Sequence, residues 1–345
     1  MAHITKISVQ HFRNHAKKSI TLSPTTTIIT GKNGTGKTSL LEALYIALQG
    51  SSFRGSDSDV LQKNAQWYRI DVEMDNGSKR TVKFDSTKPM GRKQFIIDEK
   101  TSYRLTAASK YPVVLFEPED LRLISGSPVR RRFFIDHFIS QINPLYSQSL
   151  RKYDRALKQR NNLLKQAYTT PDELFVWNVA LSEYGAYIIT ERTLFIEKIN
   201  QVLTTIYQSI SHSKDIVAIH YSHTLVDNIQ QKLISDLTKN TEKDKILGFT
   251  SVGPHRDDVI FSYNQTLAAS NASRGENRSI ILALKQIEAD IIFQITDIKP
   301  ILLLDDVFSE LDEDRQTNIS ANSYQTLITS TTPMRTKPTR NHINL

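Results

Sequence analysis

The stretch Gly31-Lys32-Asn33-Gly34-Thr35-Gly36-Lys37-Thr38 decides the fold of this chain. It fits the pattern G-x-x-x-x-G-K-[ST], in which backbone N–H groups cradle phosphates. Residues 26–30 (TTIIT) predict a short buried strand before it, and residues 39–48 predict a mostly apolar, buried helix after it. A strand, a glycine-rich turn and a helix together aim backbone donors and a helix N-terminus at one anion. The segment therefore predicts a site for a nucleoside triphosphate.

Each residue type in this loop has a physical task. The glycines let the backbone approach the phosphate oxygens, Lys37 would reach the β- and γ-phosphates, and the Thr38 hydroxyl would ligate Mg²⁺. An ordinary glycine turn is the competing interpretation, and the flanking strand and helix make it a rare one. We therefore expect ATP and Mg²⁺ as cofactors. The expected cofactor-binding set is Gly31, Lys32, Asn33, Gly34, Thr35, Gly36, Lys37 and Thr38.

Residues 301–306 (ILLLDD) form the second informative segment. Four apolar residues that run into two carboxylates predict a buried parallel strand ending at a polar site. A P-loop ATPase needs one carboxylate to hold Mg²⁺ and a second group to orient or deprotonate the attacking water. Asp305 suits the metal role. Asp306 suits the catalytic role, together with Lys37.

Composition limits the class of protein. The 345 residues carry 44 Lys+Arg against 36 Asp+Glu, a net charge of +8, which favours an anionic partner without requiring one. The absence of cysteine excludes disulfide scaffolds and Cys-ligated zinc. No run resembles the apolar part of a signal peptide or a membrane span. We expect a soluble, cytoplasmic protein that does not bind a membrane.

The rest of the chain predicts an α/β protein with two lobes. Alternating segments predict strands in the first third of the chain, and helical patterns begin near residue 128. A capping box, Thr170-x-x-Glu173, opens a long amphipathic helix. We expect an ATP-binding lobe at residues 1–112 and 297–345, and a helical, arm-like lobe at residues 113–296. We further expect a surface turn at residues 11–15, a charged linker at 240–245 and a polar tail at 331–345.

Two polar clusters leave alternatives open. Basic residues gather on the predicted helix opened by Pro144, and either a solvated face or DNA contact explains them equally well. The candidates for DNA contact are Arg130, Arg131, Arg151, Lys152, Arg155 and Lys158, within a basic run that also includes Arg132, Arg160 and Lys165. In residues 253–258 (GPHRDD) a histidine precedes two aspartates. Adjacent residues on a turn rarely converge on one ion, so we expect salt bridges here and not a metal site.

The order of these motifs resembles the ATP-binding-cassette fold, in the subclass shared with chromosome-maintenance ATPases, and it is most similar to the RecF family of DNA-repair proteins. The resemblance spans residues 4 to about 330. It is carried by residues 11–15 (HFRNH), the P-loop with Leu41-Glu42-Ala43, 127–132 (SPVRRR), 253–258, Ser273-x-Gly275, 303–306 and 309–312 (SELD).

This resemblance implies roles that spacing alone does not show. Arg13 and Asn14 would lie beside the base and ribose of ATP. Ser273 and Gly275 would form a signature that touches the γ-phosphate of ATP held by a second subunit, and residues 309–312 would cross that dimer interface. The family pattern continues with Gln after the signature glycine, whereas this chain has Glu276.

The resemblance also implies a function. RecF-like proteins form ATP-dependent homodimers, bind junctions between single-stranded and duplex DNA, hydrolyse ATP slowly, and help load recombinase with RecR-like and RecO-like partners. Three alternatives remain: the ATPase subunit of a transporter, a chromosome-maintenance-like protein with long coiled coils, and a small-molecule kinase. The helical insertion and the basic residues argue against a transporter, and the insertion is too short for long coiled-coil arms. A kinase would leave the Ser-x-Gly helix unexplained.

Overall fold

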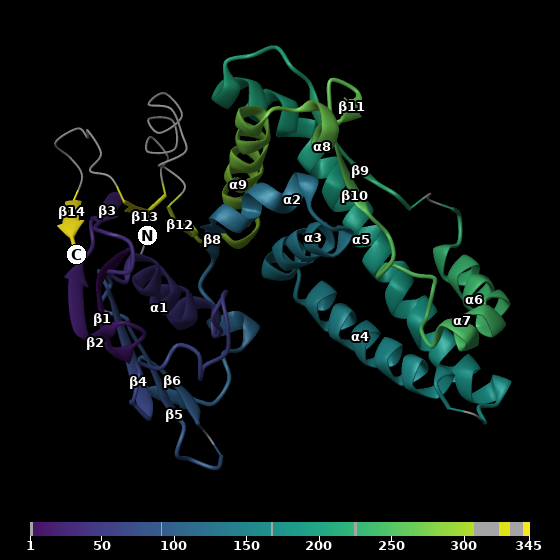
Figure 1. The fold of residues 1–345 in the computed structure, drawn as a ribbon, viewed down its shortest axis with the longest axis horizontal. Coiled ribbons are helices and arrows are strands. Elements are labelled where there is room, and N and C mark those ends of the chain that lie inside the picture. Colours follow the sequence, from purple (N-terminus) through teal and green to yellow (C-terminus); the bar gives the residue numbers. More distant parts are fainter. Residues whose placement is uncertain (1–2, 91, 167, 224–225, 307–323, 332–340) are drawn as a thin grey trace. The chain divides into compact units, whose positions relative to one another are not determined.

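The structure is a computed structural model, and it describes residues 3–90, 92–166, 168–223, 226–306, 324–331 and 341–345. The chain forms two compact units (Figure 1). The first, here named the sheet unit, comprises Met1–Asp120 and Glu288–Leu345, and the second, the arm unit, comprises Leu121–Ile287. Within the described ranges, no helix combines the length and the apolar character that crossing a membrane requires.

A five-stranded parallel sheet in the sheet unit has the order β14-β3-β13-β12-β8. Its strands are β3 (Thr26–Thr30), β8 (Val113–Phe116), β12 (Ile301–Leu304), β13 (Thr326–Ser330) and β14 (Asn341–Asn344). β3 and β12 form as predicted, and β12 is buried along its whole length. Because the strands run in parallel, their carboxyl ends meet at one edge of the sheet. The segments that follow β3 and β12 therefore lie at the same edge.

A six-stranded antiparallel sheet completes the sheet unit, in the order β2-β1-β4-β5-β6-β7. Its strands are β1 (Ile4–Phe12), β2 (His15–Thr21), β4 (Trp67–Met74), β5 (Lys79–Asp85), β6 (Lys93–Ile97) and β7 (Lys100–Ser102). Helix α1 (Lys37–Gln49) contacts strands of both sheets. All of its residues are buried except Thr38 and Ser39, which are half-buried. Contact on both sides explains why its sequence is apolar on most faces. A 3₁₀ turn, η1 (Ala107–Ser109), follows β7.

The arm unit is mainly helical. After η2 (Pro118–Leu121) come α2 (Arg122–Ser125), α3 (Pro128–Ile142), α4 (Pro144–Leu164), α5 (Pro171–Ser211), α6 (Ile229–Lys239), α7 (Thr241–Leu247) and α8 (Ala268–Asn271). A small sheet adds β9 (Val217–Tyr221), β10 (Val259–Tyr263) and β11 (Thr266–Leu267), and α9 (Arg274–Thr296) begins in the arm unit and ends in the sheet unit. The capping box predicted at the start of α5 is confirmed, with both hydrogen bonds between Thr170 and Glu173.

A buried ion pair ties the helices of the arm unit together. Arg160 of α4 and Asp244 of α7 are 2.7 Å apart, and both side chains are 0% exposed. The Arg160 guanidinium also donates to Asn178 Oδ1 of α5, to Thr250 Oγ1 and to the carbonyl of Leu237 in α6. The assignment of Arg160 to a basic surface run is therefore wrong, because its charge is neutralised inside the unit.

Three other sequence predictions differ from the structure. The sequence predicts a boundary between the lobes before Val113, but β8 pairs in parallel with β12 and lies in the sheet unit, whose first segment extends to Asp120. Residues 240–245 fall largely within α7 and are not a linker. The tail contributes β14, whose residues Asn341–Asn344 pair in parallel with β3.

Candidate nucleotide-binding site

The predicted phosphate loop connects the end of β3 to the start of α1. Gly36 is the N-cap of α1 and has a φ of 93°, and Gly34 has a φ of 83°. These left-handed conformations disfavour other residue types, which gives the glycines of the motif a local reason. The Lys37 Nζ atom donates to the carbonyls of Gly31 at 2.8 Å and Lys32 at 3.0 Å. The ammonium group is therefore held by the loop to which the motif assigns phosphate binding.

The acidic strand meets this loop directly. Thr38 Oγ1 donates to Asp305 Oδ1 at 2.7 Å, joining residues 267 positions apart in the sequence. The Thr329 hydroxyl at the end of β13 donates to the same oxygen at 2.8 Å, and the Asp305 backbone N–H donates to the carbonyl of Phe116. The parallel sheet thus brings Thr38 and Asp305, the two predicted metal-binding residues, into one contact.

The oxygen donors at this contact fit Mg²⁺. Mg²⁺ prefers oxygen ligands and is usually bound by one or two carboxylates plus substrate phosphates and water. Among the described residues, no group of three or more His, Cys, Asp or Glu side chains is placed to hold a metal ion. A metal at Thr38 and Asp305 would take further ligands from the phosphates of a bound nucleotide.

Asp306 follows in a left-handed conformation, with a φ of 49°. Its backbone N–H donates to Thr329 Oγ1 at 2.9 Å, so Thr329 holds both members of the Asp pair. Left-handed conformations outside glycine cost energy and persist where the surrounding structure enforces them, commonly at functional sites. Residues 309–312, predicted to cross a dimer interface, lie outside the described residues.

The turn between β1 and β2 contacts the P-loop, so its interpretation as a surface turn is wrong. Asn14 Nδ2 donates to the carbonyl of Gly34 at 2.7 Å, and His15 Nε2 lies 3.0 Å from the carbonyl oxygen of Gly36. Arg13 donates through Nε and Nη2 to the buried carboxylate of Glu42 in α1, at 2.9 and 2.8 Å. This hydrogen bond to Glu42 raises the pKa of Arg13. The roles of Arg13 and Asn14 beside base and ribose stay predictions.

The predicted signature lies at the start of α9. Glu276 Oε2 accepts a hydrogen bond from the Ser273 backbone N–H at 2.6 Å, and Ser273 Oγ accepts one from the Glu276 backbone N–H at 3.3 Å. This is a capping box, which satisfies two free donors of the first turn. The backbone N–H of Ser273 lowers the pKa of Glu276. The acid that departs from the family pattern is therefore directed at its own helix start, close to Ser273 and Gly275.

The predicted DNA-contact residues fall into two groups. Arg151, Lys152, Arg155 and Lys158 are exposed on α4. Arg131 pairs with Asp258 through both carboxylate oxygens at 2.8 Å, so its charge is already neutralised, while Arg130 is half-buried on α3. The same ion pair confirms the salt-bridging interpretation of residues 253–258.

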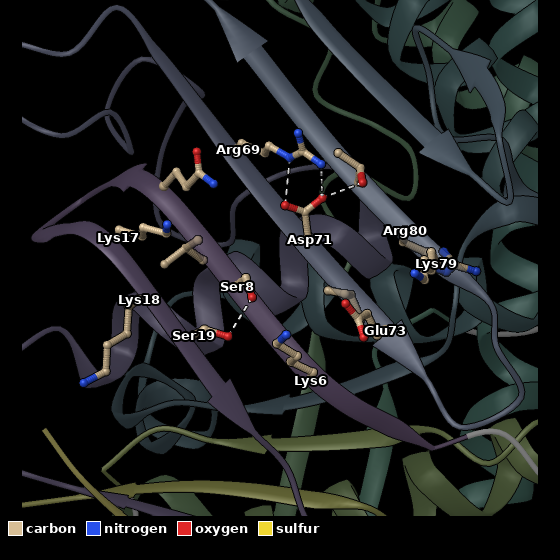
Figure 2. Close-up of a pocket in the computed structure, with 14 residues that line it drawn as sticks. Lys6, Ser8, Lys17, Lys18, Ser19, Arg69, Asp71, Glu73, Lys79 and Arg80 are labelled. Carbon is tan, nitrogen blue, oxygen red and sulfur yellow. Dashed lines mark hydrogen bonds and ion pairs between the residues drawn. The ribbon is translucent and has the colours of Figure 1, made fainter.

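A second basic surface was missed by sequence reasoning. The outer face of the antiparallel sheet forms a shallow hollow of about 440 Å³ over β1, β2, β4 and β5 (Figure 2). Lys6, Lys17 and Lys79 line it, and its Arg69 is paired with Asp71. The available signal was the alternation of these strands, which places every second, polar residue on one face. Figure 2 shows the Lys6 and Lys17 side chains on this face.

Sequence reasoning also missed three groups that support the P-loop, the turn beside it or the acidic strand. They are the imidazole of His15, the carboxylate of Glu42 and the hydroxyl of Thr329. Glu42 carried a signal, since a charged residue inside an apolar helix requires a partner when it is buried. His15 and Thr329 carried none, because their contacts depend on the tertiary arrangement.

Comparisons with known proteins agree with this geometry. Residues 3–338 match the RecF/RecN/SMC N terminal domain family. The chain is 35% identical to the DNA replication and repair protein RecF of Lachnoclostridium phytofermentans, over 95% of this chain and 92% of that protein. It is 36% identical to the RecF of Streptococcus gordonii, over 95% of this chain and 93% of that protein.

Solved structures give the same result. A structure of the recombination mediator protein RecF with ATP, in the RecFOR pathway, superposes with a TM-score of 0.86 at 30% identity, covering 97% of this chain and 94% of that one. An Smc head bound to the C-winged helix domain of ScpA shares the fold, with a TM-score of 0.53 at 15% identity, covering 96% of this chain and 90% of that one. The predicted ATP-binding-cassette-type head is confirmed. The chain therefore belongs to the RecF family of DNA replication and repair proteins, within the wider RecF/RecN/SMC N-terminal domain family.

Proposed function

We propose that this chain is a recombination mediator of gap repair that binds DNA under the control of ATP. It would dimerise on ATP, recognise junctions between single-stranded and duplex DNA, and help load recombinase while hydrolysing ATP slowly. The observation that carries this proposal is the contact between Thr38 and Asp305, which joins the P-loop and the acidic strand in one site. The solved RecF–ATP structure supports ATP as the ligand. Family membership favours this role over a transporter subunit or a chromosome-maintenance protein.

The residues of the site would divide the work. Residues 31–38 would hold the phosphates through backbone N–H groups, and Lys37 would contact the β- and γ-phosphates. Thr38 and Asp305 would hold Mg²⁺, which neutralises charge on the transferred phosphoryl group when it is bound. Asp306 would orient or deprotonate the attacking water. Arg13 and Asn14 would lie nearest the base and ribose.

The signature would complete the site of a second subunit. Ser273 offers a hydroxyl and Gly275 a close backbone approach at a helix N-terminus, a combination suited to a γ-phosphate. We therefore expect ATP to promote a homodimer and ADP to do so weakly. Sedimentation with each nucleotide measures this, and a strictly monomeric ATP-bound protein would contradict it.

Mixing two inactive variants tests whether the signature acts between subunits. Lys37→Ala removes a P-loop contact and Ser273→Arg blocks the signature. A mixed dimer contains one site with both motifs intact, so partial ATP hydrolysis should return. Each variant mixed with itself is the control. Absence of recovery in mixtures that form ATP-dependent dimers would place the signature within its own subunit, or show that the two sites act only as a pair.

DNA affinity should fall steeply with salt, because phosphate contacts release counterions. Contact with about six phosphates gives a slope of log K against log [salt] near −5. Replacing Arg151, Lys152 and Arg155 of α4 by Glu should flatten this slope without changing ATP affinity. The matched variant replaces three lysines of the outer sheet face by Glu: Lys6, Lys17 and Lys79. If only the second variant flattens the slope, the DNA surface is the sheet face and the assignment to α4 is wrong.

Partners and location follow from the same role. A protein that loads recombinase at gaps would meet RecR-like and RecO-like mediators, and it would work in the cytoplasm, where chromosomal DNA and ATP are present. Purified RecR and RecO homologues provide the test. Binding that requires both ATP and gapped DNA would support the proposal.

A further inference from the structure

Two carbonyl groups of the P-loop are held from outside the loop. Asn14 Nδ2 donates to the Gly34 carbonyl at 2.7 Å, and His15 Nε2 lies 3.0 Å from the Gly36 carbonyl oxygen. Because a carbonyl oxygen can only accept, Nε2 carries the proton in this contact. Asn14 lies in the turn between β1 and β2, and His15 is the first residue of β2, so one short segment holds two of the three glycines of the motif.

These contacts matter because a glycine-rich loop is free to rotate its peptide units. A rotated unit would direct a carbonyl oxygen toward the phosphates, where it would repel them and remove an N–H donor. A peptide unit is planar, with its C=O and N–H on opposite sides. The Gly34–Thr35 unit is fixed at both ends, since the Thr35 N–H donates to the Lys32 carbonyl at 3.3 Å. The Gly36 carbonyl also accepts the first helical bond, from the Leu40 N–H at 3.2 Å.

The turn is itself fastened to the helix that the loop opens. Arg13, the residue before Asn14, donates two hydrogen bonds to Glu42 of α1 and one to the Asp59 carbonyl. His15 is only 9% exposed, and a Cβ atom at Gly36 would overlap its ring. The imidazole therefore packs directly on this glycine, and the turn, loop and helix form one connected support.

We propose that Asn14 and His15 are positioning residues for nucleotide binding. They hold the Gly34 and Gly36 carbonyls away from the phosphates, so that neither carbonyl oxygen can rotate toward the bound anion. The inference rests on the proposed binding of ATP at residues 31–38. It gives the Asn14 amide a task in the loop beyond its proposed place near the ribose, and it gives His15 a role that its sequence position did not predict.

The test compares three variants by calorimetric titration with Mg-ATP, and by competition with Mg-tripolyphosphate, which lacks base and ribose. Asn14→Ala removes an exposed donor, His15→Phe keeps a ring but removes its donor, and His15→Gln keeps an N–H donor at a similar reach. One lost hydrogen bond corresponds to a loss of about 3- to 10-fold in affinity. We expect this loss for Asn14→Ala and His15→Phe with both ligands, and recovery to within about 2-fold in His15→Gln. Thr21→Ala, an exposed change on β2, is the matched control.

Each outcome separates the possibilities. If Asn14→Ala weakens ATP but spares tripolyphosphate, Asn14 contacts the nucleoside and the inference fails for it. If Asn14→Ala and His15→Phe bind both ligands like the wild type while Lys37→Ala loses ATP, the inference is wrong and the nucleotide site stands. If Lys37→Ala also binds ATP normally, the assignment of ATP binding to residues 31–38 is wrong, and this inference is wrong as well. If the His15→Phe variant unfolds at a lower temperature than the wild type, the ligand affinities of His15→Gln and of the exposed Asn14→Ala decide whether the inference holds.

Discussion

Asp306→Asn is expected to lower ATP turnover by about 10²-fold or more while leaving ATP binding within about twofold of the wild type. An amide has the same shape as the carboxylate but cannot accept a proton from water. The backbone of residue 306 should keep its place, because its N–H is held by the Thr329 hydroxyl. Phosphate release measures turnover, and calorimetric titration measures binding. An ATP-bound state should accumulate.

Lys37→Ala is the matched comparison for Asp306→Asn. It should abolish ATP binding or turnover and leave the fold intact, because the contacts of the Lys37 ammonium group with the described part of the chain are to carbonyls of the loop itself. Normal turnover in Asp306→Asn would move the catalytic role elsewhere. Glu310, which lies outside the described residues, is the next candidate.

Arg160→Met is expected to reduce the free energy of unfolding of the arm unit by about 3–5 kcal/mol. The change leaves the Asp244 carboxylate buried without its charge partner. It also removes the hydrogen bonds that the guanidinium donates to Asn178 Oδ1 and Thr250 Oγ1. Urea unfolding followed by circular dichroism measures the loss. ATP affinity should not change, since Arg160 has no part in the nucleotide site.

Two further variants make the Arg160 experiment decisive. Arg155→Met on the same helix removes an exposed charge and should change stability by no more than about 0.5 kcal/mol. Combining Arg160→Met with Asp244→Leu should recover much of the loss, because replacing a buried ion pair by apolar side chains is often neutral or stabilising. Equal, small effects of Arg155→Met and Arg160→Met would contradict the buried ion pair.

The centre of the nucleotide site could be predicted from sequence because it depends on local patterns. The P-loop is contiguous, and ILLLDD reports both a buried strand and the acids at its end. The rule that parallel strands place their carboxyl ends at one edge then brings Thr38 and Asp305 together. Predicting the P-loop and the acidic strand required only short, contiguous sequence patterns, and predicting their contact required one rule of sheet topology.

Other features depend on contacts that the sequence does not encode locally. From the sequence, Arg160 is one more basic residue on a predicted helix face. Only the tertiary structure shows that it forms a buried ion pair with Asp244, which is far along the chain. The predicted lobe boundary at residue 113 differs from the structure because β8 pairs with β12, which is distant in the sequence, and so lies in the sheet unit. The turn at residues 11–15 has ordinary turn composition, and only tertiary packing places Asn14 and His15 on the P-loop.

The most direct test of the account is the affinity for gapped DNA with ATP, with ADP and without nucleotide, using a fully duplex DNA of equal length as the control. The account predicts tight binding to gapped DNA only with ATP, weaker binding to duplex DNA, and loss of the ATP effect in Lys37→Ala. Asp306→Asn should keep the tight ATP-bound complex, because it binds but does not turn over. Equal affinity for gapped DNA under all three nucleotide conditions would contradict the claim that ATP controls DNA binding.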